Sequence, residues 1–540
     1  MKLRNIIPAV AMACLTLGFS SCVGDLDVDN INPQQDANYS QDALFNKMYA
    51  NLSLTGQKGP DGSGDLDDID EGFSGLIRNL WNANELSTDE AKCIWGDPGI
   101  PEFNHNSWSD AHPLMQAMYY RLFFGVTLAN YFLQETEGAD DANTLTMRAE
   151  ARFIRALHYY YLMDLYANVP IITTMSKDLA TQSSRAEVFS FIESELKDII
   201  GEGNSTEVLA DSKSNTYGRA DKTAAEMLLA RLYLNAEVYT GTARWADAQT
   251  RANNVINSQY KLNTTGAGKY SAFQLLFMGD NDTNGAQNEI ILPALYDGEQ
   301  TQSWGGTLFV IASTANSKVT DPALGNYPLG TGQAWGGNHC TKQFVQKFFP
   351  NDDAPQGNPF DLTAAAGDDR ALFYTLNHEL EISDEGDFEK GHTYLKFLNV
   401  HSDGSAPHHA DYVDTDFPLL RVAEAYLTFA EADARQNGNN CTAAGLEKIN
   451  ALRTRAHANT VSSFSLDNIC DEWSREFAYE GMRRVVLIRH NKFGGQSNYK
   501  WEWMGGTAAG SSFDAHFNIY AIPVSALNAN ENLKQNPGYE

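Results

Sequence analysis

Two stretches of the chain carry apolar residues at the spacing of amphipathic helices, and a long irregular stretch separates them. Residues 149–166 show the pattern most clearly, because they hold no Gly or Pro and place Phe153, Leu157 and Tyr160 on one helix face. Pro170 marks the end of this helix. This helix lies within a predicted helical block from Leu114 to Val169. The same criteria predict helices at Ser40–Leu54, Ser184–Ile200, Lys222–Tyr239, Trp245–Ser258, Leu419–Gln436, Ala443–Ala456 and Leu466–Arg489.

The irregular stretch covers about residues 266–418 and is rich in Gly, Asn, Asp and Trp. It has few helical periods, so we predict a long loop-rich insertion with a few short strands. Long loops of this kind inside compact domains tend to carry function. We therefore expect the binding site to lie largely in this stretch.

Two of the predicted helices share a pattern of small and aromatic residues. Ala149, Phe153 and Ala156 are spaced Ala-x3-Phe-x2-Ala, and the helix at 419–436 repeats that spacing from Ala425 to Ala432. Small residues let a neighbouring helix approach, which is typical of the second helix of a tetratricopeptide repeat. We predict a mostly α fold, with a tetratricopeptide-like helical-repeat scaffold that carries the loop-rich insertion.

The N-terminus has the three regions of a secretory signal. Lys2 and Arg4 precede the apolar run Ile6–Phe19, which has the length of a signal-peptide core and is too short to span a bilayer. Small residues then lead to Cys22, an order that resembles a bacterial lipobox, although Phe19 stands where Leu is usual. We predict that Cys22 is lipidated; ordinary signal cleavage with an incidental Cys22 is the alternative.

A lipid on Cys22 would hold the protein at the outer membrane without a transmembrane helix. The acidic stretch that follows Cys22 resembles the surface-export tether of Bacteroidetes lipoproteins. The predicted organisation is a lipoprotein signal peptide at 1–21, a tether at 22–40 and one domain at 41–540, with the helical scaffold at about 41–265 and 419–540 and the loop-rich insertion at about 266–418.

Charge and cysteine content narrow the range of partners. The formal net charge of −30 repels phosphate backbones, so nucleic acid is excluded as a partner, whereas a neutral polysaccharide meets no such repulsion. Four cysteines beyond Cys22 stand far apart without CxxC spacing, which favours buried small side chains over a zinc site or a disulfide framework. They are Cys93, Cys340, Cys441 and Cys470.

Short motifs spread over nearly the whole mature chain are specific in combination. Five of them are Arg152–Tyr160, Gly218–Lys222, Pro418–Tyr426, Arg475–Arg484 and Gln535–Tyr539. Together they resemble the SusD family, the surface glycan-binding lipoproteins of Bacteroidetes. A second set resembles the starch-binding member of that family: Thr55–Gly59, Asp65–Asp67, Asp70–Gly72, Asn84–Leu86 and Thr88–Glu90. The resemblance implies a lid role on a SusC-like TonB-dependent outer-membrane transporter.

Three loop tryptophans are the candidate sugar platform: Trp95, Trp304 and Trp335. The aliphatic face of a sugar ring stacks on an aromatic ring, with about 1 kcal/mol per pair. Trp304 and Trp335 each precede Gly-Gly, which we expect to leave one ring face uncrowded. Judged from composition alone, the alternative that these tryptophans only pack the loops against the protein is favoured over a binding role.

The resemblance reverses that preference. It implies that Trp95 and Trp335 match tryptophans of an aromatic arc and that Trp304 stands where the starch-binding member has Tyr. It also implies that Arg78 hydrogen-bonds sugar hydroxyls. The Asn that the family has in this site is not clearly retained in this chain, and Asp97 is the residue nearest to its position. Such an arc suits a curved α-1,4-glucan better than flat cellulose.

The segment from Asp280 opens like a calcium loop, D-x-D-x-N-G. Ile291 stands at its twelfth position, where an EF-hand has Glu, so other oxygens must substitute. The candidate ligands are Asp280, Asp282, Asn284, Gln287 and Glu289. A solvated turn is the alternative, and the resemblance favours a structural calcium ion.

The function that we expect is capture of starch-type α-glucan oligosaccharides at the cell surface and their delivery to the transporter, with no catalytic residues and no catalytic cofactor. A surface glycoside hydrolase, which needs two carboxylates about 5–10 Å apart, is one alternative. A peptide-binding helical-repeat adaptor is another. No HExxH spacing exists, and the His408-His409 pair is interpreted as part of a solvated loop.

Overall fold

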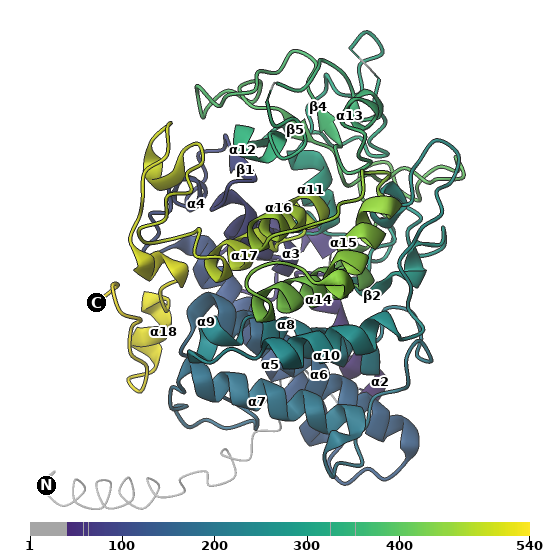
Figure 1. Ribbon diagram of the computed structural model, residues 1–540. Coiled ribbons are helices and arrows are strands. Elements are labelled where there is room, and N and C mark those ends of the chain that lie inside the picture. The colour runs from purple at the N-terminus through teal and green to yellow at the C-terminus, as the bar shows by residue number, and fades with distance from the viewer. Residues whose placement is uncertain (1–39, 58, 63, 325, 352) are drawn as a thin grey trace, which may run out of the picture. The chain divides into compact units, whose positions relative to one another are not determined.

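The computed structural model describes residues 40–540 except 58, 63, 325 and 352. The predicted signal peptide, Cys22 and nearly all of the predicted tether lie outside the described residues. Residues 45–540 form one compact unit, which holds both the scaffold helices that follow residue 50 and the loop-rich insertion (Figure 1).

Most of the longer helices lie where the apolar spacing predicts them, and several short helices were not predicted. Those of the first scaffold stretch are α2 (Gln41–Ala50), α3 (Leu76–Trp81), α4 (Ile100–His105), α5 (Pro113–Glu135), α6 (Ala142–Tyr166), α7 (Arg185–Lys197), α8 (Lys222–Leu234), α9 (Ala236–Thr240) and α10 (Trp245–Ile256). The insertion holds α11 (Thr307–Ser313), α12 (Lys342–Val345) and α13 (Pro359–Ala366). The C-terminal stretch forms α14 (Val422–Gln436), α15 (Ala443–Arg455), α16 (Leu466–Phe477), α17 (Arg483–Arg489) and α18 (Val524–Ala529).

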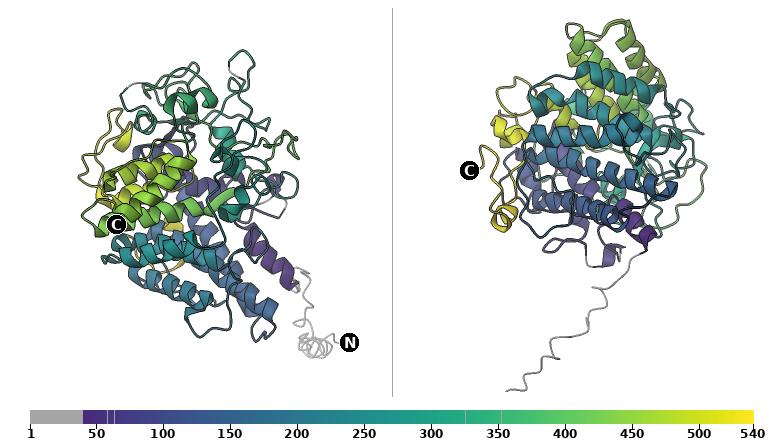
Figure 2. Two further views of the ribbon diagram at one scale, coloured as in Figure 1. Left: turned by 45° about the vertical axis from the view of Figure 1, so that its right-hand side comes forward. Right: turned by 90° about the horizontal axis from the view of Figure 1, so that it is seen from below.

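The scaffold is a stack of neighbouring helices. Helix α5 packs on α6, α6 on α7, α8 on α10, α10 on α14 and α14 on α15, so the two scaffold stretches join through α10 and α14 (Figure 2). Ala149, Phe153 and Ala156 of the repeat pattern are fully buried on α6, as close helix approach requires. The mostly α, tetratricopeptide-like fold class is confirmed.

A short sheet ties the insertion to the scaffold. Strand β2 (Ile290–Ala294) pairs antiparallel with β6 (Phe417–Arg421), with Ile290 opposite Arg421 and Ala294 opposite Phe417. Because β6 leads directly into α14, this pairing brings the two ends of the stretch between β2 and β6 together next to the helices. Two further strand pairs lie at least partly inside the insertion: β1 (Ala91–Cys93) with β3 (Asn338–Cys340), and β4 (Phe373–Tyr374) with β5 (Thr393–Tyr394).

The prediction of one continuous helix over Leu466–Arg489 is wrong, because the helix is interrupted between the end of α16 and the start of α17. Tyr479 and Gly481 there have φ of 67° and 73°, left-handed values that an α-helix cannot accommodate. The break turns Glu480 toward Arg421, whose Nε donates to Glu480 Oε2 at 2.8 Å and whose Nη1 donates to Glu476 Oε1 at 2.8 Å. Two of the family motifs are therefore joined in one buried ion-pair cluster.

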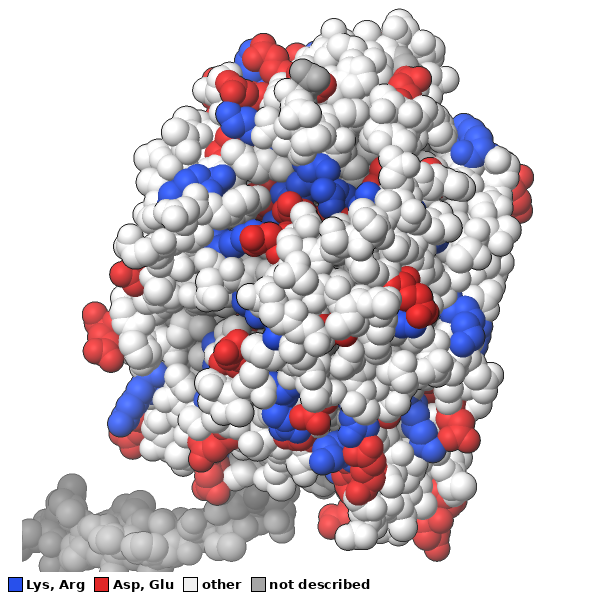
Figure 3. Space-filling view, viewed as in Figure 1, with Lys and Arg blue, Asp and Glu red and all other residues white. Residues whose placement is uncertain are grey.

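Among the residues that the structure describes, none of the helices is both long and apolar enough to cross a membrane. The four cysteines named above are free thiols, and Cys93, Cys340 and Cys470 are buried, which agrees with their interpretation as small packing side chains. On the face drawn in Figure 3, basic side chains lie mostly beside acidic ones, with wide uncharged areas between them.

Candidate glycan-binding site

Strands β1 and β3 bring two of the predicted tryptophans together, although 240 positions separate them in the chain. Trp95 follows β1, and Trp335 precedes β3. The antiparallel register places Cys93 opposite Asn338, and one further bond extends it, from the backbone N–H of Ile94 to the carbonyl of Gly337 at 3.0 Å. The end of one strand and the start of its partner therefore meet, and the two indoles meet with them.

Helix α11 fixes the third tryptophan in the same group. Trp304 stands just before the start of α11, and the backbone of Arg78 donates to the carbonyl of Gly305 at 3.0 Å. At the other end of α11, the backbone N–H groups of Trp335 and Gly337 donate to carbonyls of Ala312 and Ser313, both at 2.7 Å. These bonds satisfy carbonyls that a helix end otherwise leaves unpaired, so one helix holds both tryptophan loops.

The three indoles form one row with Trp335 in the middle. Its ring centroid lies 6.4 Å from that of Trp95 and 6.1 Å from that of Trp304, and the interplanar angles are 48° and 50°. All three side chains are half-buried, so each ring is held by the protein and still reaches solvent. The prediction grouped these residues, and the structure brings them together.

Arg78 is buried near the Trp95 end of this row. Its guanidinium carbon lies 3.7 Å from the ring centroid of Phe73 and 5.9 Å from that of Trp95. Burial lowers its pKa to about 10, while nearby carboxylates including Asp97 act in the opposite direction, so the side chain stays cationic at neutral pH. Arg78 Nε has no hydrogen-bond partner among the described residues, whereas Asp97 is exposed in the loop after Trp95.

The glycines that follow the tryptophans have a packing role that was not predicted. A Cβ on Gly337 would lie 2.3 Å from the Trp95 ring, and one on Gly306 would lie 2.3 Å from the Tyr296 hydroxyl. The space beside these glycines is therefore filled by other side chains, and Gly337 seats the Trp95 indole. These glycines therefore let a neighbouring ring or loop approach the backbone closely.

We expect Gly337→Ala to weaken glycan binding about tenfold, because the added methyl group must displace the Trp95 ring and so open the row. Affinity electrophoresis in starch-containing gels measures the change. Gly96→Ala is the matched control, since a Cβ there meets nothing within 4 Å although the residue adjoins Trp95. Equal retention of the two variants would show that the Trp95 position does not matter.

Two aromatic residues that the sequence interpretation missed continue the row beyond Trp304. The Tyr412 ring centroid lies 4.9 Å from that of Trp304, and the His409 ring lies 5.0 Å from Tyr412. Their segment is fixed to the Trp335 loop, since Thr331 Oγ1 donates to the carbonyl of Asp411 at 2.6 Å. His409 therefore belongs to a structured loop whose residues are half-buried or exposed, which agrees with the interpretation of a solvated loop and adds a fixed position for this ring.

The predicted calcium ligands do not all come together. Glu289 is fully buried between two arginines, 3.1 Å from Arg421 Nη1 and 3.2 Å from Arg455 Nη1, and it also accepts a backbone N–H. Its carboxylate balances these buried charges, so its assignment as a calcium ligand is wrong.

The other four candidate ligands share one turn, in which Asn284 Nδ2 donates to Asp280 Oδ1 at 3.0 Å and Gln287 Oε1 accepts from Gly285. These four supply carboxylate and amide oxygens, which suit calcium. No group of three or more His, Cys, Asp or Glu among the described residues is arranged to hold a metal ion.

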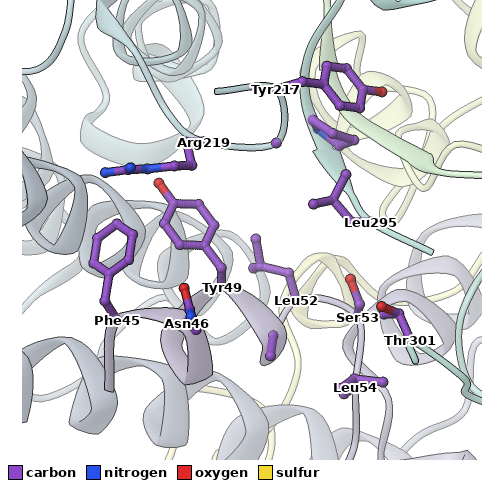
Figure 4. A pocket seen from close by; sticks show the side chains of 13 residues that line it. Phe45, Asn46, Tyr49, Leu52, Ser53, Leu54, Tyr217, Arg219, Leu295 and Thr301 are labelled. Carbon is purple, nitrogen blue, oxygen red and sulfur yellow. The ribbon is translucent and has the colours of Figure 1, made fainter. Parts of the chain in front are cut away.

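An apolar cavity of about 260 Å³ lies between the end of α2, the turn before α8 and β2 (Figure 4). The Tyr49 hydroxyl donates to Glu150 Oε2 at 2.6 Å, and the Arg219 guanidinium lies over the Phe45 ring at 4.7 Å while pairing with Glu150. These polar groups already have partners, and none of the three tryptophans lines the cavity. We interpret it as a packing feature of the scaffold.

Two family models match the chain. One, described as "SusD family", matches residues 356–539, and one, described as "Starch-binding associating with outer membrane", matches residues 26–234. The starch-binding protein SusD of Bacteroides thetaiotaomicron is 39% identical over 574 aligned residues, which cover 100% of this chain and 99% of that protein. A SusD-like protein of Bacteroides ovatus is 24% identical, over 66% of this chain and 62% of that protein.

Solved structures share the fold. A SusD superfamily protein from Parabacteroides distasonis superposes with a TM-score of 0.66 at 19% identity, over 94% of this chain and 100% of that one. A laminarin-binding SusD-like protein superposes with a TM-score of 0.65 at 18% identity, over 92% of this chain and 99% of that one. The helical stack with its loop-rich insertion is therefore a known architecture.

Proposed function

Because the chain belongs to the SusD family, we propose that it captures starch-type α-glucan oligosaccharides at the cell surface and passes them to a SusC-like TonB-dependent transporter. The observation that carries the proposal is the row of half-exposed rings from Trp95 through Trp335 and Trp304 to Tyr412. Successive rings are tilted by 48°, 50° and 52°, so they form no flat platform. A glycan chain that curves fits such a row better than a flat ribbon does.

The free energy available from stacked rings is enough for binding a glycan but not for catalysing its cleavage. Each sugar–ring stack contributes about 1 kcal/mol, and a millimolar Kd corresponds to about −4 kcal/mol, so a few stacked rings with hydrogen bonds from Arg78 suffice. Catalysis needs much larger stabilisation of a transition state than a stacking row supplies. We therefore propose that the protein binds glycan and does not cleave it.

Membership of this family also supports a proposal for the cellular location. One of the matching family models describes association with the outer membrane, and the sequence places a lipobox-like Cys22 after the predicted signal peptide. We propose that lipidated Cys22 anchors the protein to the outer membrane with the domain at the cell surface. Mass spectrometry of the mature protein, with Cys22→Ser as the control, tests the acylation.

A glycan array probed with the chain from Val23 onward tests the ligand. Maltooligosaccharides and starch are expected to bind, because successive rings of the row are tilted against each other. Cellulose fragments, which are flat, and anionic glycans, which the strongly acidic chain repels, are not expected to bind. Release of reducing ends from soluble starch would favour the hydrolase alternative. Preference for peptides over glycans would favour the helical-repeat adaptor.

We also propose a structural calcium ion at the turn of Asp280, Asp282, Asn284 and Gln287. Chelation with EDTA is then expected to lower the Tm, because the carboxylates in the turn would repel each other without the ion. The Asp282→Asn variant is expected to start with a lower Tm and to respond little to EDTA. A wild-type melt that EDTA leaves unchanged contradicts the proposal, and differential scanning calorimetry measures it.

A further inference from the structure

The row of rings ends at a histidine whose tautomer the backbone fixes. His409 Nδ1 accepts hydrogen bonds from the backbone N–H groups of Asp411 at 3.0 Å and Tyr412 at 3.1 Å. A ring nitrogen that accepts carries no proton, so the neutral imidazole must carry its proton on Nε2. That Nε2–H is a hydrogen-bond donor with no partner among the described residues, on a half-exposed side chain.

The segment that carries His409 is held from both sides. Asp414 lies 2.9 Å from His401 Nε2 and 3.2 Å from His408 Nδ1, and its own backbone N–H donates to Asn399 Oδ1 at 2.7 Å. The Asp411 end is tied to the Trp335 loop, as described above. The donor at Nε2 is therefore held in place before any ligand arrives, which limits the entropy lost on binding.

We propose that His409 forms an additional subsite at the end of the row, where its Nε2–H donates to a hydroxyl oxygen of a sugar beyond those stacked on the tryptophans. This inference rests on the proposed glycan-binding function and adds a preference for chain length. The site takes neutral oligosaccharides long enough to pass Trp304 and Tyr412. Shorter ones stay on the tryptophans and do not reach His409.

Two substitutions separate the donor of His409 from its role in the turn. Asn at position 409 keeps the acceptor, because an Asn side-chain oxygen accepts from backbone N–H groups two and three residues ahead, as in an Asx turn. The Asn side chain has no hydrogen-bond donor where His409 has Nε2–H. Gln at 409 has the opposite character, because its longer side chain places an amide N–H near the Nε2 position. His409→Asn and His409→Gln therefore form a matched pair.

The experiment measures the Kd of wild type and both variants for maltotriose and maltoheptaose by isothermal titration calorimetry, with the Tm as a check on folding. His409→Asn is expected to keep the wild-type Tm and its maltotriose Kd, and to bind maltoheptaose about three- to tenfold more weakly. His409→Gln is expected to bind maltoheptaose more tightly than His409→Asn does.

The inference is overturned if His409→Asn binds both sugars like wild type, or if it loses affinity for both equally. A wild-type protein that binds neither sugar would refute the proposed glucan function itself. A wild type that binds both with unchanged variant affinities would refute only the subsite. The two failures are therefore distinguishable in one set of titrations.

Discussion

Trp335→Ala is expected to abolish retention of the protein on starch gels. Trp335 is the middle ring of the row, so its removal takes away one sugar contact and the ring–ring contacts on both sides, at 6.4 and 6.1 Å. Loss of one sugar–ring stack costs about 1 kcal/mol of binding free energy, and Trp95 and Trp304 each lose the ring that packs against them. Together these losses are expected to lower the affinity for glycan about ten- to hundredfold. Since the complex is expected to be weak, such a loss removes measurable binding.

The fold is expected to survive this substitution, because the side chain is half-buried and its loop is held to α11 by backbone bonds. Trp335→Phe keeps an aromatic face and is expected to retain part of the binding. Trp245→Ala is the matched control, since Trp245 is also half-buried but lies on scaffold helix α10. If Trp335→Ala and Trp245→Ala migrate alike, the row is not the glycan site.

The scaffold could be predicted because amphipathic helices carry their signal locally. Ser184 and Glu187 form a capping box at the start of α7, and Asp221 caps α8, both at boundaries that the residues indicate. The break after α16 could not be predicted, because a left-handed Tyr479 is stabilised by distant partners: Glu85 Oε1 accepts the N–H of Gly481 at 2.6 Å.

The site could be predicted only in part, and the resemblance supplied most of it. Trp95 and Trp335 are separated by more than two hundred residues and meet through a three-residue strand pair, a pairing that no local pattern indicates. Tyr412 and His409 lie in a loop whose shape depends on bonds to other loops. The one available signal was an aromatic beside paired histidines in a Gly- and Asp-rich stretch, and many surface loops share that composition.

The motif Thr88–Glu90 shows the same limit, because its sequence carries only a resemblance and its structural role depends on residues far away in the chain. Asp89 is fully buried and receives Arg483 Nε at 2.6 Å, Lys347 Nζ at 2.7 Å and the Tyr499 hydroxyl at 2.5 Å. It stands two residues before β1, the strand that positions Trp95. The motif is therefore a buried support for the strand that positions the row of aromatic rings.

Asp89→Asn is accordingly expected to lower the free energy of unfolding by about 3–5 kcal/mol, because it leaves the buried cations of Arg483 and Lys347 without their carboxylate. Urea denaturation followed by circular dichroism measures the loss. Since β1 rests on this cluster, starch retention is expected to fall as well, although Asp89 is buried away from solvent.

The pH dependence of stability identifies the cause. The Arg483 and Lys347 charges hold the pKa of the Asp89 carboxyl well below its usual range, so its stabilisation is complete above the unfolded-state pKa of about 4 and is lost as the pH falls below it. Asp89→Asn removes this contribution, and the stability of the variant is expected to fall less steeply in acid than that of wild type.

Asp211→Asn is the matched control, because it breaks an exposed pair with Lys222. It is expected to leave both the stability and its dependence on acid pH nearly unchanged. An Asp89→Asn variant as stable as Asp211→Asn would show that the buried cations find other partners, and the support for β1 would then have to lie elsewhere.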